Sequence, residues 1–341
     1  MKKAVWIDID NSPHVQIFEH IIKELEKEYT VYVTAREYNQ TVGLLDLKGI
    51  KYKLVGKHPG KNLFNKYFFN LLRTFRLFIW GIGKNISLSV THGARAGILA
   101  SKLLGVRSIV MFDYEHVESF LFKKMSKYLL ATSYLKKDDL LKLEFPEDKL
   151  NFYPGLKENI YLPFFKEDPS IIERLGINTE KIVILLRPAS EVSHYNLDVS
   201  YDLIGELFEL LVSRDDVQVV FVPRYDSQKE KYAEYINNPK KNVIVPKQVE
   251  EGLNLVFHSD LVISGGGTMN REAAAMNTPV YSIFQGKRPG VDTNLEKQGK
   301  LSFITSKEDL EKIVFKKKDI SDIDMNRDAF ESVLSFIKER V

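Results

Sequence analysis

Short apolar runs alternate with helix-forming segments along this chain, and that alternation limits the possible folds more than any other feature of the sequence. Parallel strands need long crossover connections, which are usually helices, so regular alternation predicts an α/β protein with parallel sheets covered by helices. A chain of 341 residues usually forms two domains. The predicted strands are 3–9, 29–34, 51–55, 86–91, 107–112 and 128–132, then 181–187, 217–222, 242–245, 261–264, 279–284 and 301–304.

The alternation is interrupted once, at "NFYPGLKENIYLPFF" (151–165), which is rich in aromatic residues and lacks clear periodicity. We interpret this stretch as the linker between two Rossmann-like, doubly wound parallel-sheet domains that face each other across a cleft. The predicted N-terminal domain is 1–155, and the C-terminal domain is 156–323. The last segment, 324–341, is amphipathic and is expected to form a helix that crosses back to the N-terminal domain.

Composition excludes several classes of protein. The chain has no cysteine, so it contains neither disulfides nor thiolate metal sites. The apolar run at the N-terminus is short and is broken by Asp8, so no signal peptide is predicted. No apolar stretch approaches the roughly 18 residues that a membrane-spanning helix needs. We therefore expect a cytoplasmic protein.

Charge is distributed unevenly along the chain. Residues 1–165 contain 25 Lys and Arg against 17 Asp and Glu, whereas residues 166–341 contain 24 against 29. The sequence has no helix-turn-helix, zinc finger or RNA-binding aromatic motif, so nucleic acid is not an expected partner. An anionic membrane surface is the alternative partner for the basic half.

The segment 61–84 is the best candidate for such a membrane contact, because it contains five Lys and Arg and no acidic residue. A basic helix with an aromatic face can lie in a membrane interface, which would place the protein peripherally at the inner face of the membrane. The alternative is a crossover helix that packs its apolar side on the sheet. The apolar residues at helical spacing are Phe64, Tyr67, Phe68, Leu71, Leu72, Phe75, Phe78 and Ile79.

The stretch "DLVISGGGTMNREAAAMNTPVYSIF" (260–284) predicts a strand, a glycine turn, a short helix and a second strand. Glycines allow the backbone to come close to a ligand, and the helix that follows directs unpaired N–H groups and its positive dipole end toward the turn. An anion, most simply a phosphate, suits such a position. The loops after the strands are where doubly wound sheets bind their ligands.

In the first half, "NSPHV" follows the first strand, with Ser12 suited to the N-cap and Pro13 to the first helical position. His14 would then lie in the first turn, where the helix dipole favours a neutral imidazole that can accept a proton. His14 is therefore a candidate general base, and Asp113 and Glu115, which follow the fifth strand, are candidates for the same role. The alternative for His14 is a structural or solvent-exposed histidine.

The Asp-x-Asp pair in "WIDID" (6–10) places Asp8 and Asp10 on one face of the first strand. Such a pair could bind a metal or provide the nucleophile of a phosphatase, but the chain lacks the late lysine and the Gly-Asp-rich carboxylate loop that such a phosphatase needs. We interpret Asp8 as a hydrogen-bonded interior carboxylate and Asp10 as a residue of the cleft.

Several motifs resemble those of known families. The order "HSDLVIS", "GGGTMNREAA" and "NTPVYSIF" resembles the nucleotide-sugar-binding half of the two-Rossmann-domain (GT-B) glycosyltransferases and of the non-hydrolysing UDP-N-acetylglucosamine 2-epimerases. The set "DNSPHV", "HGA", "FDYE", "GLKENIYL", "HYN" and "GGGTMNREAA" most closely resembles a mainly archaeal family catalogued as domain of unknown function 354. The resemblance covers nearly the whole chain and implies a GT-B type fold.

The resemblance also implies roles for individual residues. The backbone around Gly265, Gly266, Gly267 and Thr268 would hold the diphosphate of a nucleotide sugar, and Glu272 would accept hydrogen bonds from the ribose hydroxyls. Helix geometry agrees, because Glu272 lies about one turn inside the helix. The alternative is that the glycines form only a tight turn and that Glu272 merely favours the N-terminal half of its helix.

Three further cationic residues of the second half are candidates to neutralise the diphosphate. Arg187, His194 and Arg288 all lie in loops that follow predicted strands. Arginines at strand ends often pair with acidic neighbours, which is the alternative for Arg187 and Arg288.

The activity implied by the resemblance is metal-independent transfer of a sugar from a nucleotide-diphosphate sugar, with a UDP-sugar as substrate, no cofactor, and a glycan or lipid-linked acceptor on the N-terminal domain. A nucleotide-sugar epimerase is the alternative. Against it, "THGA" with His92 replaces an acidic residue of the epimerases, and "LLRPAS" replaces their histidine, although Glu115 lies in a comparable place. A non-catalytic nucleotide-sugar-binding protein is the third interpretation.

Overall fold

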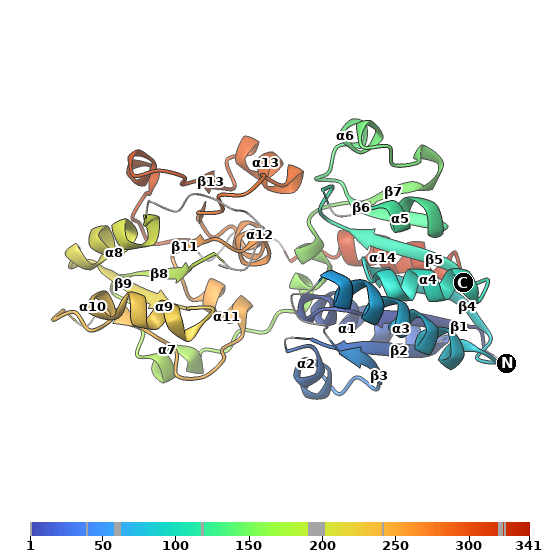
Figure 1. Ribbon diagram of the computed structural model, residues 1–341. Coiled ribbons are helices and arrows are strands. Elements are labelled where there is room, and N and C mark those ends of the chain that lie inside the picture. The colour runs from blue at the N-terminus through green and yellow to red at the C-terminus, as the bar shows by residue number, and fades with distance from the viewer. Residues whose placement is uncertain are drawn as a thin grey trace. The chain divides into compact units, whose positions relative to one another are not determined.

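The computed structural model describes residues 2–38, 40–57, 63–116, 119–189, 202–240, 242–319, 323 and 325–341, with only the backbone for residues 63–66. These residues form two compact units. The first comprises Met1–Phe164 and Asn326–Val341, and the second comprises Phe165–Met325. Figure 1 shows the helices and strands of each unit.

The first unit contains, in chain order, β1 (Ala4–Ile9), α1 (Ser12–Glu26), β2 (Thr30–Glu37), α2 (Thr41–Leu47), β3 (Lys53–Lys57), α3 (Leu63–Gly81), β4 (Ile86–His92), α4 (Arg95–Leu103), β5 (Arg107–Phe112), α5 (Phe120–Met125), β6 (Tyr128–Thr132), α6 (Lys137–Lys142), the 3-10 helix η1 (Glu147–Lys149), β7 (Leu150–Tyr153), the 3-10 helices η2 (Lys157–Ile160) and η3 (Leu162–Phe164), and finally α14 (Asp328–Lys338).

The strands of the first unit form, within the described residues, a seven-stranded sheet in the order β3-β2-β1-β4-β5-β6-β7. All neighbouring strands are parallel. Helices α3, α4 and α5 contact one another in turn, as do α1 and α2, so the crossover helices form two separate groups. Trp6 of β1 and Leu77 of α3 belong to one buried cluster, which places α3 on the face of the sheet that Trp6 occupies.

The end of the first unit differs from the predicted linker at 151–165. Residues Leu150–Tyr153 form β7, whose backbone pairs with β6 at the edge of the sheet. Phe164 stacks on His20 with ring centroids 3.8 Å apart and makes an edge contact with Phe330 of α14. These contacts attach the chain to the first unit as far as Phe164, nine positions beyond the boundary predicted at 155. The stretch as far as Phe164 therefore belongs to the first unit, whereas Phe165 packs on Phe257 of the second unit, a division that periodicity alone did not reveal.

Helix α14 belongs to the first unit although it follows the second unit in the sequence. Its buried side carries Phe330, Val333 and Ile337. Lys338 forms an ion pair with Glu28 at the end of α1. The C-terminal segment therefore returns to the unit that contains the N-terminus.

The second unit contains, in chain order, α7 (Ser170–Leu175), β8 (Ile182–Arg187), α8 (Leu203–Ser213), β9 (Val217–Phe221), α9 (Asp226–Lys231), α10 (Ala233–Ile236), β10 (Val243–Ile244), α11 (Gly252–Phe257), β11 (Leu261–Ser264), α12 (Gly267–Ala275), β12 (Val280–Ser282), α13 (Gly290–Lys297), β13 (Ser302–Phe303) and the 3-10 helix η4 (Glu308–Lys312).

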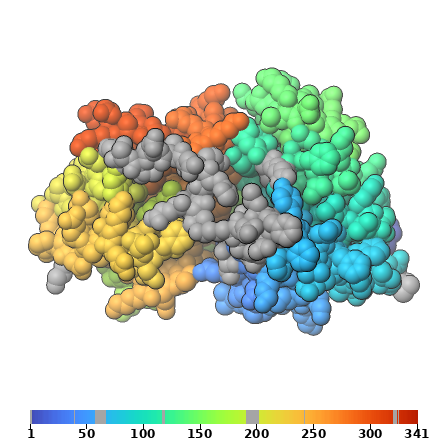
Figure 2. All heavy atoms as spheres, in the orientation of Figure 1, coloured from blue at the N-terminus to red at the C-terminus, as the bar shows by residue number. Residues whose placement is uncertain are grey.

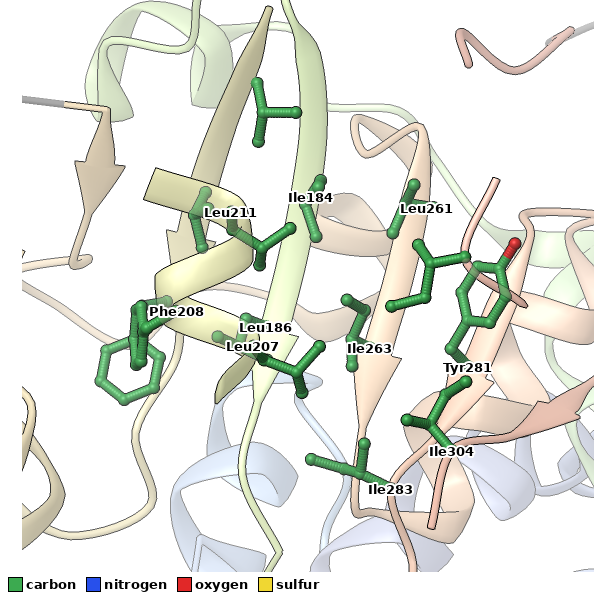
Figure 3. Packing of buried hydrophobic residues seen from close by; sticks show 14 of the residues in the cluster. Ile184, Leu186, Leu207, Phe208, Leu211, Leu261, Ile263, Tyr281, Ile283 and Ile304 are labelled. Atoms are coloured by element: carbon green, nitrogen blue, oxygen red, sulfur yellow. The ribbon is translucent and has the colours of Figure 1, made fainter. Parts of the chain in front are cut away.

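The strands of the second unit form, among the residues described, a six-stranded sheet in the order β10-β9-β8-β11-β12-β13, again with parallel neighbours. Alternate residues of β8, such as Ile184 and Leu186, point to one face of the sheet. Figure 3 shows them beside Leu207 and Phe208 of α8. The two parallel sheets confirm the predicted α/β fold class, because each half of the chain with alternating strands and helices forms one doubly wound unit.

Candidate functional site

Both sheets reverse their strand order at one point, and the candidate residues gather there. In the first unit the reversal lies between β1 and β4, and in the second it lies between β8 and β11. Connections on the two sides of such a point leave in opposite directions, and doubly wound sheets bind their ligands beyond the carboxyl ends of these strands. His14 and His92 lie at that end of the first sheet, and Arg187 and Gly265 lie at that end of the second.

The first cluster, which we call the relay cluster, consists of His14, His92, Asp113, Lys157 and Glu158. The rings of His14 and His92 lie 4.7 Å apart. Nε2 of His92 is 3.5 Å from Oδ1 of Asp113, and Nζ of Lys157 donates a hydrogen bond of 2.7 Å to Oδ2 of Asp113. Nζ of Lys157 is also 3.5 Å from Oε1 of Glu158. These contacts form a continuous path of ionisable groups at the carboxyl ends of β1, β4 and β5.

The relay cluster is shielded from solvent. His92, Asp113, Lys157 and Glu158 are all buried. Placing charges in such a site is favourable only when they are paired, and the Lys157 ammonium between two carboxylates provides that pairing. The cluster therefore pairs one ammonium with two carboxylates, which leaves one negative charge in excess while both histidines are neutral.

His14 lies in the first turn of α1, where its backbone N–H donates a hydrogen bond to the backbone carbonyl of Asn11. The residue is partly exposed, but its Nδ1 atom is buried and has no hydrogen-bond partner among the described residues. Burial lowers the pKa of His14 well below its usual value, and the neighbouring His92 and Lys157 lower it further. We had expected the helix dipole to keep this imidazole neutral; in the structure, burial is the main cause.

The helix cap differs from the predicted one. Asn11, not Ser12, is the N-cap residue of α1, and its side chain accepts a hydrogen bond from the N–H of Ser12. The hydroxyl of Ser12 instead accepts a hydrogen bond from the N–H of Gln40, before α2. Asparagine and serine cap equally well, so the sequence alone could not decide between these neighbours.

Glu115 is buried and lies two positions after Asp113 in the sequence. Its Oε1 atom is 3.4 Å from Nε2 of His116. Of the three predicted catalytic residues, His14 and Asp113 lie together in the relay cluster, where Asp113 acts electrostatically on His14. Glu115 and Asp113 nonetheless leave the same strand, β5.

The two aspartates of "WIDID" have separate partners. Asp8 is buried, receives two hydrogen bonds of 2.9 and 2.6 Å from Arg73 of α3, and accepts a third from Thr34. Its role as a hydrogen-bonded interior carboxylate agrees with the interpretation from the sequence. Asp10 lies 2.7 Å from Nε of Arg36. These pairs fix α3 and β2 against β1 rather than presenting two free carboxylates to a metal.

The second cluster surrounds the glycine corner, residues Gly265–Gly267 between β11 and α12. None of these glycines has a positive φ, so backbone conformation does not require them. A Cβ atom on Gly265 would lie 2.5 Å from Cβ of Ala189, and one on Gly266 would lie 2.5 Å from Nη2 of Arg224. A Cβ on Gly267 would make only an ordinary contact at 3.9 Å. Two of the glycines thus allow the loops after β8 and β9 to approach the corner closely.

The close approach brings two guanidinium groups together. Arg187 ends β8, and Arg224 follows β9 and donates a hydrogen bond from Nε to the carbonyl of Pro188. Burial and the neighbouring Arg224 lower the pKa of Arg187 to about 10, whereas Glu272 opposes that change. Burial also lowers the pKa of Arg224. Both groups stay charged at neutral pH, and neither has an ion-pair partner within the described part of the chain.

Glu272 is buried in α12, and its carboxylate lies beside Gly252 at the start of α11. It is the one acidic side chain that acts electrostatically on Arg187. Asn270 of the same helix donates hydrogen bonds to the carbonyl of Ser264 and to the hydroxyl of Ser282, which fixes the start of α12 against β11 and β12. The position of Glu272 is consistent with a role beside the glycine corner.

The remaining predicted binding residues lie elsewhere. Arg288 is exposed, lies over the ring of Phe303 and is 3.4 Å from Glu296, so the structure places it in surface contacts of its own unit. Thr268 lies in the first turn of α12, next to the corner. His194 falls outside the described residues.

Sequence reasoning missed three members of the two clusters. Lys157 and Glu158 lay in the predicted linker, although "GLKENIYL" was among the motifs that resembled a family. Arg224 follows a predicted strand in "PRYDSQ", so the rule that ligands bind at carboxyl ends could have selected it. Within the described residues, no group of three or more His, Asp or Glu side chains is arranged to hold a metal ion.

Two parallel α/β sheets with polar clusters at their reversal points define a protein of the GT-B architecture. Residues 3–338 match the family described as "Protein of unknown function (DUF354)", and the chain belongs to that family. An uncharacterized protein of Methanocaldococcus jannaschii, MJ0665, is 31% identical over 308 residues, which cover 85% of this chain and 84% of that protein.

Solved structures with the same architecture include enzymes that handle nucleotide sugars. The Staphylococcus aureus MnaA–UDP co-structure has a TM-score of 0.75 at 15% identity and covers 98% of this chain and 96% of that one. UDP-GlcNAc 2-epimerase from Neisseria meningitidis, bound to UDP-GlcNAc, has a TM-score of 0.74 at 14% identity and covers 98% and 100%. MurG from Acinetobacter baumannii has a TM-score of 0.60 at 14% identity and covers 99% of each chain. At these identities the likeness concerns the fold.

Proposed function

We propose that this protein binds a nucleotide-diphosphate sugar, with UDP-sugars as the expected class, and transfers the sugar to a glycan or lipid-linked acceptor. The observation that carries the proposal is the pair Arg187 and Arg224 at the glycine corner. Two partly buried guanidinium groups without an ion-pair partner in the described residues favour a ligand that supplies negative charge. The solved relatives with UDP or UDP-GlcNAc in their titles support the choice of ligand.

In this proposal the second unit stabilises the leaving group. The bond between the anomeric carbon and the diphosphate oxygen breaks, and the nucleoside diphosphate leaves with the electron pair. Its developing charge is stabilised by Arg187, Arg224 and the N–H groups at the start of α12. Glu272 accepts hydrogen bonds from the ribose hydroxyls, as its place beside the corner allows.

The first unit supplies the base. An acceptor hydroxyl attacks the anomeric carbon and loses its proton to His14, whose lowered pKa keeps the imidazole neutral and able to accept it. The imidazolium that forms is favoured by Asp113, the one acidic residue among the groups that act on His14. His92 lies between the two and completes the path for the proton.

Epimerisation of a nucleotide sugar is the second candidate. The buried carboxylates Asp113 and Glu115 favour it, because epimerisation needs groups that remove and return a proton on the sugar. The UDP-GlcNAc 2-epimerase structure cited above also has a higher TM-score than MurG. A non-catalytic nucleotide-sugar-binding protein is the third candidate.

Mass spectrometry after incubation with a panel of nucleotide sugars distinguishes the three. Free nucleoside diphosphate that forms only with a lipid or glycan acceptor supports transfer. A sugar isomer that still carries its nucleotide supports epimerisation, and binding without turnover supports the non-catalytic protein. The Glu272→Ala variant should weaken binding in every case, so unchanged affinity would contradict the assignment of the ribose. Failure of every nucleotide sugar to bind would overturn the proposal itself.

A further inference from the structure

Helix α3 exposes a row of large apolar side chains. Phe68, Leu71, Phe75, Ile79 and Ile82 are 54%, 66%, 56%, 53% and 60% exposed. Their spacing of three, four, four and three positions places them along one side of the helix and its end. Figure 2 shows the light-blue residues of α3 at the surface of the molecule. Contiguous apolar surface of this kind usually marks an interaction site.

Packing on the sheet accounts for the opposite side of α3. Arg73, Thr74 and Leu77 are buried, and Arg73 reaches Asp8 on β1. The helix therefore serves as a crossover between β3 and β4. The face that it packs on the sheet is not the aromatic face identified from the sequence. The exposed row, which we call the apolar row, plays no part in that packing.

The surroundings of the apolar row are strongly basic. Between Asp46 and Asp113 the sequence contains no Asp or Glu and twelve Lys or Arg. Arg76 on α3 is exposed, and so are Lys57 on β3 and Lys102 on α4. Helix α3 contacts both β3 and α4, so Lys57 and Lys102 lie on elements that adjoin this helix.

We propose that the apolar row inserts into the interfacial region of an anionic lipid bilayer, while the neighbouring Lys and Arg side chains contact the headgroups. Insertion buries apolar surface, and each cation near an anionic bilayer adds a favourable electrostatic contribution. Charge complementarity selects this occupant over a second copy of the chain, which would bring two basic surfaces together. The proposal does not depend on nucleotide-sugar binding.

The test uses the full chain with vesicles of phosphatidylcholine, with and without phosphatidylglycerol. We expect co-sedimentation with the anionic vesicles and little with neutral ones. A Phe68→Ser/Phe75→Ser/Ile79→Ser variant should bind anionic vesicles at least about tenfold more weakly. Val249→Ser, at an apolar residue of the second unit that is 76% exposed, is the control and should bind as the unchanged protein does.

A charge variant tests the same surface without removing apolar side chains. Arg76→Glu should lower binding to anionic vesicles by about fivefold or more, and high salt should lower it similarly. Unchanged circular dichroism shows that the variants are folded. Equal vesicle binding by the unchanged chain and both variants would overturn the proposal, as would absence of vesicle binding. A dimer that the triple variant dissociates, without vesicle binding, would overturn it in favour of a second copy.

Discussion

The two clusters differ in the sign of their excess charge. The relay cluster of the first unit contains Asp113 and Glu158 around the Lys157 ammonium, so one negative charge remains in excess while both histidines are neutral. The glycine corner of the second unit contains Arg187 and Arg224 with Glu272 as the nearby carboxylate, so one positive charge remains in excess. A cluster with excess negative charge is suited to stabilising an imidazolium that forms beside it, whereas one with excess positive charge is suited to an anionic ligand. We therefore expect loss of a charge from the relay cluster to lower the stability of the first unit, and loss of a charge from the glycine corner to weaken ligand binding by the second unit.

Loss of the one cation from the relay cluster should have the largest effect. Lys157→Met leaves Asp113 and Glu158 buried without their shared cation, which should destabilise the first unit by about 3–5 kcal/mol. Both tryptophans, Trp6 and Trp80, lie in the first unit, so their fluorescence during urea unfolding follows that unit. Lys137→Met is the control, because its ion pair with Glu147 is exposed and should contribute less than about 1 kcal/mol. Similar losses for both variants would contradict the comparison.

Loss of one cation from the glycine corner should act on ligand binding instead. Arg224→Ala should weaken the binding of UDP by about tenfold to a hundredfold, since a charged hydrogen bond contributes about 1.5–3 kcal/mol. Thermal unfolding should stay nearly unchanged, because relief of repulsion from Arg187 offsets the lost contacts. Titration calorimetry measures the affinity. Arg214→Ala, at an exposed ion pair with Asp216, is the control and should bind UDP normally.

The glycines sharpen the comparison by moving Arg224 without deleting it. In Gly266→Ala the new Cβ would overlap Nη2 of Arg224, so the guanidinium should move away and UDP affinity should fall by a similar or smaller factor. In Gly267→Ala the nearest atom is 3.9 Å away, and affinity should stay within about threefold. The double variant Gly266→Ala/Arg224→Ala should bind UDP no more weakly than Arg224→Ala alone. Additive losses would show that Gly266 acts by another route.

The smallest effect concerns pH. The pKa of His14 is lower in the folded chain than its usual value, so the unfolded chain binds more protons as pH falls below about 6.5. The contribution of neutral His14 to the free energy of unfolding of the first unit should therefore be complete above that pH and decline below it. His14→Gln should make the tryptophan-monitored urea midpoint less sensitive to pH between about 7.5 and 5. His20, whose pKa burial also lowers, contributes in the same direction and remains in both proteins. An unchanged pH dependence would refute the burial of the His14 imidazole.

Much of the architecture was predictable because strand and helix periodicities are local. Strands Arg107–Phe112 and Leu261–Ser264 occupy the predicted positions. The edge strand β7 was missed, since four residues between aromatic and glycine-rich stretches show no clear alternation. The candidate site was predictable in its loops, because strand ends mark where ligands bind in such sheets.

The sequence by itself determined the α/β class and the loops in which charged residues would collect, because those features depend on spacing within short segments. Tertiary structure alone decided which charges meet. Asp8 pairs with Arg73, and Asp113 with Lys157, across 65 and 44 positions of chain. Strand order and helix packing set these pairings. Because Arg73 of α3 reaches Asp8, the pairing also turns the aromatic side of α3 away from the sheet. A charged side chain acquires its partner only after the sheet has assembled, so composition and periodicity carry no record of it.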